Sequence, residues 1–382
     1  MRVLFFSTYY HPYLSGLITY PKKILTYLSN NHNITIITFR YSKNLPQHST
    51  DGKIAVHRLP FLVKISKGFI SPQSLIAFAH SLRTTDIVIL NIPNFEALPL
   101  AIFAKIWQKP IISIFHCRVD LGKRFFNRII AATLNLSVSL QLWLSDTIVI
   151  YTQDYFEHLH LEKRFTHKTK VILPAVSQPK VNEHQLERLL KQKRDNTWIG
   201  FCGRVSKEKG IHHLINAIDT LTGKNKHVLI IAGPYGDDVV GESQYYNEIK
   251  SLLGKKKITC IFLGKLSDGN LGAFYRAIDV LVLPSVNRTE AFGMVQVDAM
   301  LSGKPVIASN LPGVRIPINL TNMGVLVEPG DEDGLAQAII KIISQPQRYS
   351  NSQLRDHARK VFSEQSTYDC YDQLLADITD ES

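Results

Sequence analysis

Short runs of apolar residues recur along the first part of the chain, separated by longer segments with helical spacing. The runs span residues 3–6, 34–38, 87–90, 111–115 and 147–150. Their apolar residues are continuous rather than alternating, which is typical of parallel strands buried on both faces of a sheet. The pattern predicts a doubly wound α/β unit with helices between its strands.

The same pattern starts again after a polar stretch that contains Pro179. The runs of this second set span residues 198–202, 228–232, 258–263, 280–283, 305–308 and 324–327. The sequence therefore predicts two Rossmann-like domains, one over residues 1–178 and one over residues 179–364.

The C-terminal segment carries apolar residues at helical spacing, among them Tyr371, Leu374 and Ile378. This spacing predicts a helix over residues 365–379 that packs on another part of the chain. We expect residues 365–382 to return to the first domain and complete it.

Composition narrows the class of protein. The chain has 382 residues, 45% of them apolar and 20% charged, which excludes a disordered or coiled-coil protein. Its 4 cysteines show no metal-like spacing, which argues against a zinc site and a disulfide framework and indicates a reducing compartment. No segment reaches the ~20 mainly apolar residues of a membrane span. We expect a cytoplasmic protein without a bound metal.

The net charge of +12 is unevenly spread along the sequence. Residues 1–178 hold 20 Lys and Arg against 8 Asp and Glu, whereas residues 179–382 hold 24 of each kind. A basic first domain indicates an anionic partner, which could be an acceptor molecule, the inner face of a membrane or a nucleic acid. The sequence contains no recognised nucleic-acid motif, so we expect no nucleic-acid partner.

Two segments mix cations with apolar residues and could dock on a membrane. The first, residues 61–70, includes Lys64 and Lys67 beside Phe61 and Phe69; the second is residues 123–128. Such a mixture suits peripheral docking. The alternative is that the apolar residues fold back into the core.

A glycine-flanked basic loop follows the run at 198–202. It begins with Gly203 and Arg204 and ends with Lys209, just before a helical pattern. A loop between a strand and a helix, with two fixed cations, is suited to a diphosphate. The alternative is a solvated basic turn.

A second group of polar residues follows the run at 280–283. Glu290 would lie in the loop, and a helix would open at Phe292, Gly293, Met294 and Val295, with free N–H groups that face an anion. Asp298 comes eight residues after Glu290, roughly two helical turns, so we expect it on the same side but deeper along that helix. The alternatives are that Glu290 compensates the helix dipole and that Asp298 is an exposed helical acid.

These residues, together with the segment Gly303-Lys304-Pro305, resemble the family 4 retaining glycosyltransferases of the GT-B fold. The resemblance implies two Rossmann-like domains that face each other across a cleft, the first for the acceptor and the second for the nucleotide sugar. It implies that Arg204 and Lys209 bind the donor diphosphate, that Glu290 contacts the donor sugar and that Asp298 contacts the ribose.

The chain departs from the family pattern at two positions. Asp298 stands where the family usually has Glu, which shortens the reach toward the ribose by one methylene group. In the first loop, Ser15-Gly16 replaces a common Gly-Gly pair, which leaves the loop geometry open. Gly16 still lets the backbone approach a phosphate or a sugar.

Three further positions are candidates by their place at strand ends. His116 follows the run at 111–115, where the resembling proteins often place a histidine that faces the donor sugar; the alternative is a structural histidine. Gly233 and Leu266 follow two strands of the second domain and could contact the nucleotide base through main-chain groups, or form ordinary turns.

The sequence as a whole predicts a metal-independent retaining hexosyltransferase. It would move a sugar from a nucleotide diphosphate to a glycan or lipid-linked acceptor, in the synthesis of cell-surface polysaccharide or glycolipid, with His116, Arg204, Lys209 and Glu290 as catalytic residues. We expect no cofactor besides the donor substrate. A sugar-nucleotide epimerase of the same fold is the alternative, and a nucleic-acid-binding protein is a more distant one.

Overall fold

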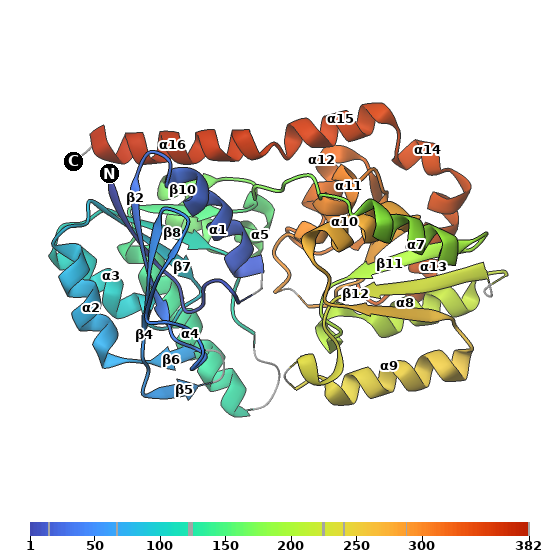
Figure 1. The fold of residues 1–382 in the computed structure, drawn as a ribbon, viewed down its shortest axis with the longest axis horizontal. Helices are drawn as coiled ribbons and strands as arrows, with labels where there is room; N and C mark the ends of the chain where they lie inside the picture. Colours follow the sequence, from blue (N-terminus) through green and yellow to red (C-terminus); the bar gives the residue numbers. More distant parts are fainter. Residues whose placement is uncertain are drawn as a thin grey trace. The chain divides into compact units, whose positions relative to one another are not determined.

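The computed structural model describes residues 1–13, 16–65, 68–120, 125–223, 226–239, 241–287 and 289–380. The chain divides into two compact units (Figure 1). The first consists of Met1–Ala175 together with Glu364–Ser382, and the second of Val176–Ser363. The C-terminal helix therefore returns to the first unit.

An eight-stranded sheet forms the centre of the first unit, in the order β10-β9-β8-β7-β1-β2-β4-β3. Its strands are parallel except for the β3–β4 pair. The strands are β1 (Arg2–Phe6), β2 (Asn33–Phe39), β3 (His48–Asp51), β4 (Ile54–Leu59), β7 (Ile87–Ile92), β8 (Ile111–Phe115), β9 (Thr147–Ile150) and β10 (Thr169–Val171). A separate hairpin joins β5 (Val63–Ile65) to β6 (Gly68–Ile70).

Helices cover both faces of this sheet (Figure 1). They are α1 (Gly16–Leu28), α2 (Pro72–Leu82), α3 (Ala97–Ile106), α4 (Phe125–Leu144), α5 (Gln153–His158), α6 (Glu162–Phe165) and α16 (Glu364–Asp380). From β1 the chain moves through α1 to β2, whereas from β7 it moves the opposite way through α3 and α4. Because such crossovers are right-handed, α1 lies on one face and α3 and α4 lie on the other. α16 packs on α1, and α2 packs on α3.

The second unit contains a six-stranded parallel sheet in the order β13-β12-β11-β14-β15-β16. Its strands are β11 (Thr197–Cys202), β12 (His227–Ala232), β13 (Cys260–Gly264), β14 (Val280–Leu283), β15 (Val306–Ser309) and β16 (Gly324–Val327). The helices are α7 (Glu183–Lys193), α8 (Ile211–Thr220), α9 (Ser243–Lys256), α10 (Asp268–Ala277), α11 (Met294–Leu301), α12 (Ile316–Thr321), α13 (Glu332–Ser344), α14 (Pro346–Tyr349) and α15 (Ser352–Val361). This strand order is that of a dinucleotide-binding sheet, so the predicted α/β class is confirmed for both units.

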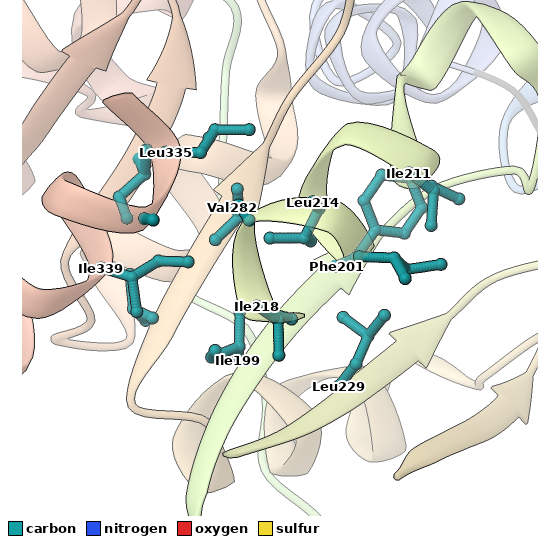
Figure 2. Packing of buried hydrophobic residues seen from close by; sticks show 14 of the residues in the cluster. Ile199, Phe201, Ile211, Leu214, Ile218, Leu229, Val282, Leu335 and Ile339 are labelled. Atoms are coloured by element: carbon teal, nitrogen blue, oxygen red, sulfur yellow. The ribbon is translucent and has the colours of Figure 1, made fainter. Parts of the chain in front are cut away.

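The core of the second unit lies between its sheet and the helices α8 and α13 (Figure 2). Phe201 and Leu229 contribute from neighbouring strands, Leu214 from α8 and Ile339 from α13, and all four are buried. Each large apolar side chain buried in this way contributes about 1.5–3 kcal/mol to stability. This packing fixes β11 and β14, whose carboxyl ends carry the candidate site.

The return of the C-terminal helix changes the charge balance of the first unit. Residues 364–382 include 6 acidic and no basic residues. With them, the first unit holds 20 basic and 14 acidic residues, and the second unit holds 24 basic and 18 acidic residues. Each compact unit therefore has a net charge of +6, so the uneven charge along the sequence does not persist between the folded units.

Candidate active site

The predicted donor-site segments meet at the centre of the second sheet. β11 and β14 are neighbours there, and the strand order reverses between them. The loop that begins at Gly203 follows β11, and the loop that carries Glu290 follows β14. Ligands of open α/β sheets bind beyond the carboxyl ends of the strands at such a reversal. Two loops that lie far apart in sequence thus share one edge of the sheet.

Glycine turns line this edge next to β11. The N–H of Gly203 donates to the carbonyl of Ala232 at 2.9 Å, and the N–H of Gly233 donates to the carbonyl of Gly264 at 2.8 Å. A Cβ on Gly233 would lie 2.1 Å from the carbonyl oxygen of Gly203, so only glycine permits this approach. Leu266 follows β13 and is half-buried. The predicted base contacts therefore lie at neighbouring strand ends.

Lys209 and Glu290 form an ion pair across the two loops. Lys209 ends a short 3-10 turn that spans Lys207–Lys209. The side chains of Lys209 and Glu290 are 17% and 20% exposed, so both charges are partly withdrawn from water. The structure thus joins the predicted diphosphate cation directly to the predicted sugar contact.

Arg204 lies in the same loop but is held by a different carboxylate. Its Nη2 donates to Oε1 of Glu208 at 2.7 Å, and the Arg204 side chain is 47% exposed. An exposed pair of this kind contributes only about 0.3–0.5 kcal/mol, so a diphosphate could replace Glu208 as the partner of the guanidinium at little cost.

The N-terminus of α11 opens beside Glu290. Gly293 precedes the helix with a φ of +74°, and no side chain caps the first turn, which includes Met294 and Val295. Phe292 turns inward, where it is buried with its ring 6.3 Å from that of Phe362. The first-turn N–H groups and the helix dipole favour an anion at this end.

Asp298 lies on α11, held by a tyrosine that the sequence did not single out. The hydroxyl of Tyr275, on α10, donates to Oδ2 of Asp298 at 3.4 Å. Burial raises the pKa of Tyr275 well above its usual value, which keeps the phenol protonated. Burial also raises the pKa of the neighbouring Cys202 thiol to about 12, so Cys202 stays a neutral thiol. Tyr275 lies in the buried run Ala273-Phe274-Tyr275 of α10, so its sequence pattern is simply that of a core residue.

Glu290 and Asp298 do not share a helix. Because α11 begins at Met294, the segment before it is loop, and the eight-residue spacing is not two helical turns. The prediction that Asp298 lies two helical turns beyond Glu290, on the same side, is therefore wrong. The two carboxylates are instead placed separately, Glu290 by Lys209 and Asp298 by Tyr275.

The segment Gly303-Lys304-Pro305 lies away from this edge. It precedes β15, so it lies at the amino ends of the strands, opposite the candidate site. Lys304 is largely buried, and burial lowers the pKa of its ammonium group to about 8. This part of the family pattern therefore belongs to the packing between α11 and β15.

We expect Lys304→Met to stabilise the second unit by about 1–2 kcal/mol at pH 7, because it removes a charge that folding desolvates. The pKa of Lys304 is about 8 in the folded chain, whereas its ordinary value is 10.5. Between pH 8 and pH 10.5 the unfolded chain therefore binds more protons than the folded chain. The free energy of unfolding of the wild type then increases as the pH rises. The advantage of the variant should therefore shrink toward pH 10. Urea unfolding at pH 7 and pH 10 measures the difference in stability between Lys304→Met and the wild type, and Lys341→Met, at an exposed position, is the control. A difference that is the same at both pH values would contradict the lowered pKa of Lys304.

His116 lies at the carboxyl end of β8 in the first unit, where both ring nitrogens are hydrogen-bonded. Nε2 pairs with Oδ1 of Asn91, and Nδ1 pairs with the hydroxyl of Tyr151. The Nδ2 group of Asn91 donates to the carbonyl of Leu17 at 3.1 Å and to Oγ of Ser7 at 3.0 Å, which fixes the orientation of its amide. His116 Nε2 therefore donates, and Nδ1 accepts from Tyr151.

Burial lowers the pKa of His116 to about 3, so the ring is neutral at ordinary pH. The ring meets the description of a structural histidine, and a direct contact with a donor sugar would require one of its two partners to leave. Gly16, the other predicted site residue of this unit, is the exposed first residue of α1. Ser15, which precedes it, lies outside the described residues.

Within the described parts of the chain, no group of three or more His, Cys, Asp or Glu side chains is arranged to hold a metal ion. Arg204 and Lys209 supply positive side chains at this edge, and the start of α11 adds N–H groups. Groups of these kinds can bind an anionic ligand.

Comparisons with known proteins show which proteins this chain resembles. Residues 182–361 match the family described as glycosyl transferases group 1. The capsular polysaccharide biosynthesis glycosyltransferase CapM of Staphylococcus aureus is 31% identical over 160 residues, which cover 41% of this chain and 40% of CapM. The D-rhamnosyltransferase WbpZ of Pseudomonas aeruginosa is 25% identical over 91% of this chain and 88% of its own.

The fold of the whole chain also has solved relatives. HepE of Anabaena, crystallised with UDP and glucose, superposes with a TM-score of 0.79 and 22% identity, covering 98% of this chain and 99% of HepE. The matches to the first curated relatives span only about two fifths of their length or less. Residues 182–361 are therefore similar to the glycosyl transferases group 1 family, and the chain has the GT-B fold.

Proposed function

We propose that this protein is a metal-independent retaining glycosyltransferase that moves a hexosyl unit from a nucleotide diphosphate sugar to a glycan or lipid-linked acceptor. The ion pair between Lys209 and Glu290 at the strand reversal is the observation that carries the proposal. The family match, the polysaccharide role in the name of CapM and the sugar transfer in the name of WbpZ support it. We propose cell-surface polysaccharide or glycolipid synthesis as its setting.

The leaving diphosphate would be stabilised by protein cations. When the glycosidic C–O bond breaks, negative charge gathers on the diphosphate and oxocarbenium character develops on the sugar. Lys209 and Arg204 would exchange their present carboxylate partners for diphosphate oxygens, and the start of α11 would add N–H groups. After this exchange the groups would be positioned before the bond breaks, so that step would need little reorganisation.

Binding of the diphosphate would also free Glu290 for the sugar. Its carboxylate now accepts from Lys209 and would then accept hydrogen bonds from sugar hydroxyl groups. Asp298, held by Tyr275, would reach a ribose hydroxyl. We propose that Gly203, Gly233 and Leu266 contact the nucleotide through their main chain.

The proposed transfer keeps the anomeric configuration of the donor, with attack by the acceptor hydroxyl on the face that the diphosphate leaves. The test uses UDP-hexose as the first donor, because HepE was crystallised with UDP and glucose. NMR of the product with a simple glycan acceptor should show the donor's anomer, and a chelator should leave the rate unchanged. An inverted product or a chelator-sensitive rate contradicts the proposal. An epimerase would convert the sugar without acceptor and without release of UDP.

A further inference from the structure

The outer side of α4 is a stripe of large apolar residues. Phe125, Ile129, Leu136, Leu140 and Trp143 are all exposed; Leu136 is 62% exposed and Trp143 is 61% exposed. Their spacing of three, four or seven residues places them on one side of the helix. On the opposite side, Val138 and Leu142 are buried in the first unit together with Ser137 and Gln141. A contiguous stripe of large apolar residues left exposed in this way is typical of a surface that binds a partner or a membrane.

The neighbouring helices extend this apolar side. α3 packs on α4, and α2 packs on α3. Ile102 and Ile106 are exposed on α3, and Ile76 is exposed on α2. The three helices together form what we call the α2–α3–α4 face.

The charged residues within the helices of the α2–α3–α4 face are all basic. The sequences of α2, α3 and α4 contain no Asp or Glu, and they carry Lys105 on α3 and Arg128 on α4. Lys168 lies at the end of α4, where its Nζ donates to the carbonyl of Trp143 at 2.8 Å. Asp146 at this rim is paired with Lys105 at 2.5 Å. The acidic helix α16 packs on α1, on the other side of the sheet.

We propose that the α2–α3–α4 face rests on an anionic lipid bilayer. A bilayer offers apolar contact for the stripe and negative charge for the cations at its rim, whereas a second copy of the chain would bring like charges together. A tryptophan flanked by lysines suits the interface between lipid headgroups and acyl chains. None of the described helices is long and apolar enough to cross a membrane, so α4 would lie along the surface.

The two docking segments expected from the sequence are exposed in part. In the segment 61–70, Phe69 is buried and its ring centroid lies 4.3 Å from that of Phe61, so these rings fold back into the first unit, whereas Leu62 is 74% exposed and Lys64 is exposed. In the segment 123–128, the structure exposes Phe125 and Arg128. Lys67, Lys123 and Arg124 lie outside the described residues.

Vesicle sedimentation of the full chain tests the proposal. The chain should pellet with vesicles of phosphatidylcholine mixed with phosphatidylglycerol, and weakly with phosphatidylcholine alone. Leu136→Glu should weaken this binding by about tenfold or more, because it places a carboxylate in the stripe. Ile340→Glu, at a 56% exposed position of the second unit, should bind as the wild type does.

Fluorescence of Trp143 gives a second readout that does not depend on Leu136. Emission should shift to shorter wavelength when anionic vesicles are added, and Trp143→Phe should lose most of the shift. Absence of vesicle binding, equal loss in Leu136→Glu and Ile340→Glu, or a dimer in solution that Leu136→Glu dissociates would each overturn the proposal. Docking and sugar transfer are separate measurements, so either can fail alone.

Discussion

Lys209→Ala should slow sugar transfer by about 100- to 1,000-fold, which is the usual cost of removing one preorganised group that stabilises developing negative charge. The substitution removes the cation proposed for the leaving diphosphate and also leaves Glu290 without its ion-pair partner. The decrease should appear in kcat as well as in kcat/KM, since the interaction is strongest in the transition state. Steady-state release of the nucleotide diphosphate measures both constants.

Lys207→Ala is the matched control for this substitution. Lys207 lies two residues earlier in the same turn, and its side chain is exposed. The control variant should keep the wild-type rate within about threefold, since surface charges contribute little. Equal losses in the two variants would show that general basicity of the loop, and not the position of Lys209, controls transfer.

Gly210→Ala should lower the free energy of unfolding of the second unit by about 3 kcal/mol or more, because the new methyl group meets backbone. Gly210 has a φ of +66°, and a Cβ there would lie 2.1 Å from the carbonyl oxygen of Pro284, at the end of β14. Neither atom can move without shifting a strand end. Urea unfolding measures the loss, with fluorescence of the buried Trp198 as the reporter.

Gly223→Ala is the control that separates the cost of the steric clash at Gly210 from the cost of an alanine with a positive φ. Gly223 has a φ of +67°, and no described atom outside its immediate neighbours lies within 4 Å of an added Cβ. Its substitution should cost only about 1 kcal/mol, the strain of a left-handed alanine. If the two variants lose the same stability, the close approach of Gly210 to β14 does not constrain the site.

The central strands were predictable because they are buried on both faces. Continuous apolar runs placed the strands at 111–115, 147–150 and 280–283 with the bounds that the structure has. β4 was not predicted, because His57 and Arg58 interrupt its apolar residues near the edge of the sheet. The hairpin strands β5 and β6 are only 3 residues each, too short to give a periodic signal.

The candidate site was predictable residue by residue but not as an arrangement. The loop positions of Arg204, Lys209 and Glu290 and the family resemblance marked them as candidates, yet only the fold shows that Lys209 pairs with Glu290 while Arg204 pairs elsewhere. Tyr275 was missed because its helix pattern is that of a core residue. The partners of His116 come from separate strands, so no local pattern indicates that its ring is already satisfied.

The charge of each folded unit could not be predicted from the order of residues in the sequence. Residues 1–178 have a net charge of +12, but folding brings the acidic residues of α16 into the same unit. The basic character therefore belongs to one face and not to the first domain as a whole, because the sequences of α2, α3 and α4 contain cations and no carboxylates. Exposure of α4 could not be inferred from its sequence, because an apolar helix is usually a buried one.

Thermal unfolding with and without nucleotides tests the central claim most directly. UDP or another nucleoside diphosphate should raise the Tm of the wild type, because a ligand that binds only the folded state stabilises it. The Tm of Lys207→Ala should rise by the same amount, and Lys209→Ala should lose most of the rise relative to its own starting Tm. If no nucleoside diphosphate or its sugar raises the Tm, or if Lys209→Ala responds as the wild type does, the edge between β11 and β14 is not a nucleotide-sugar site.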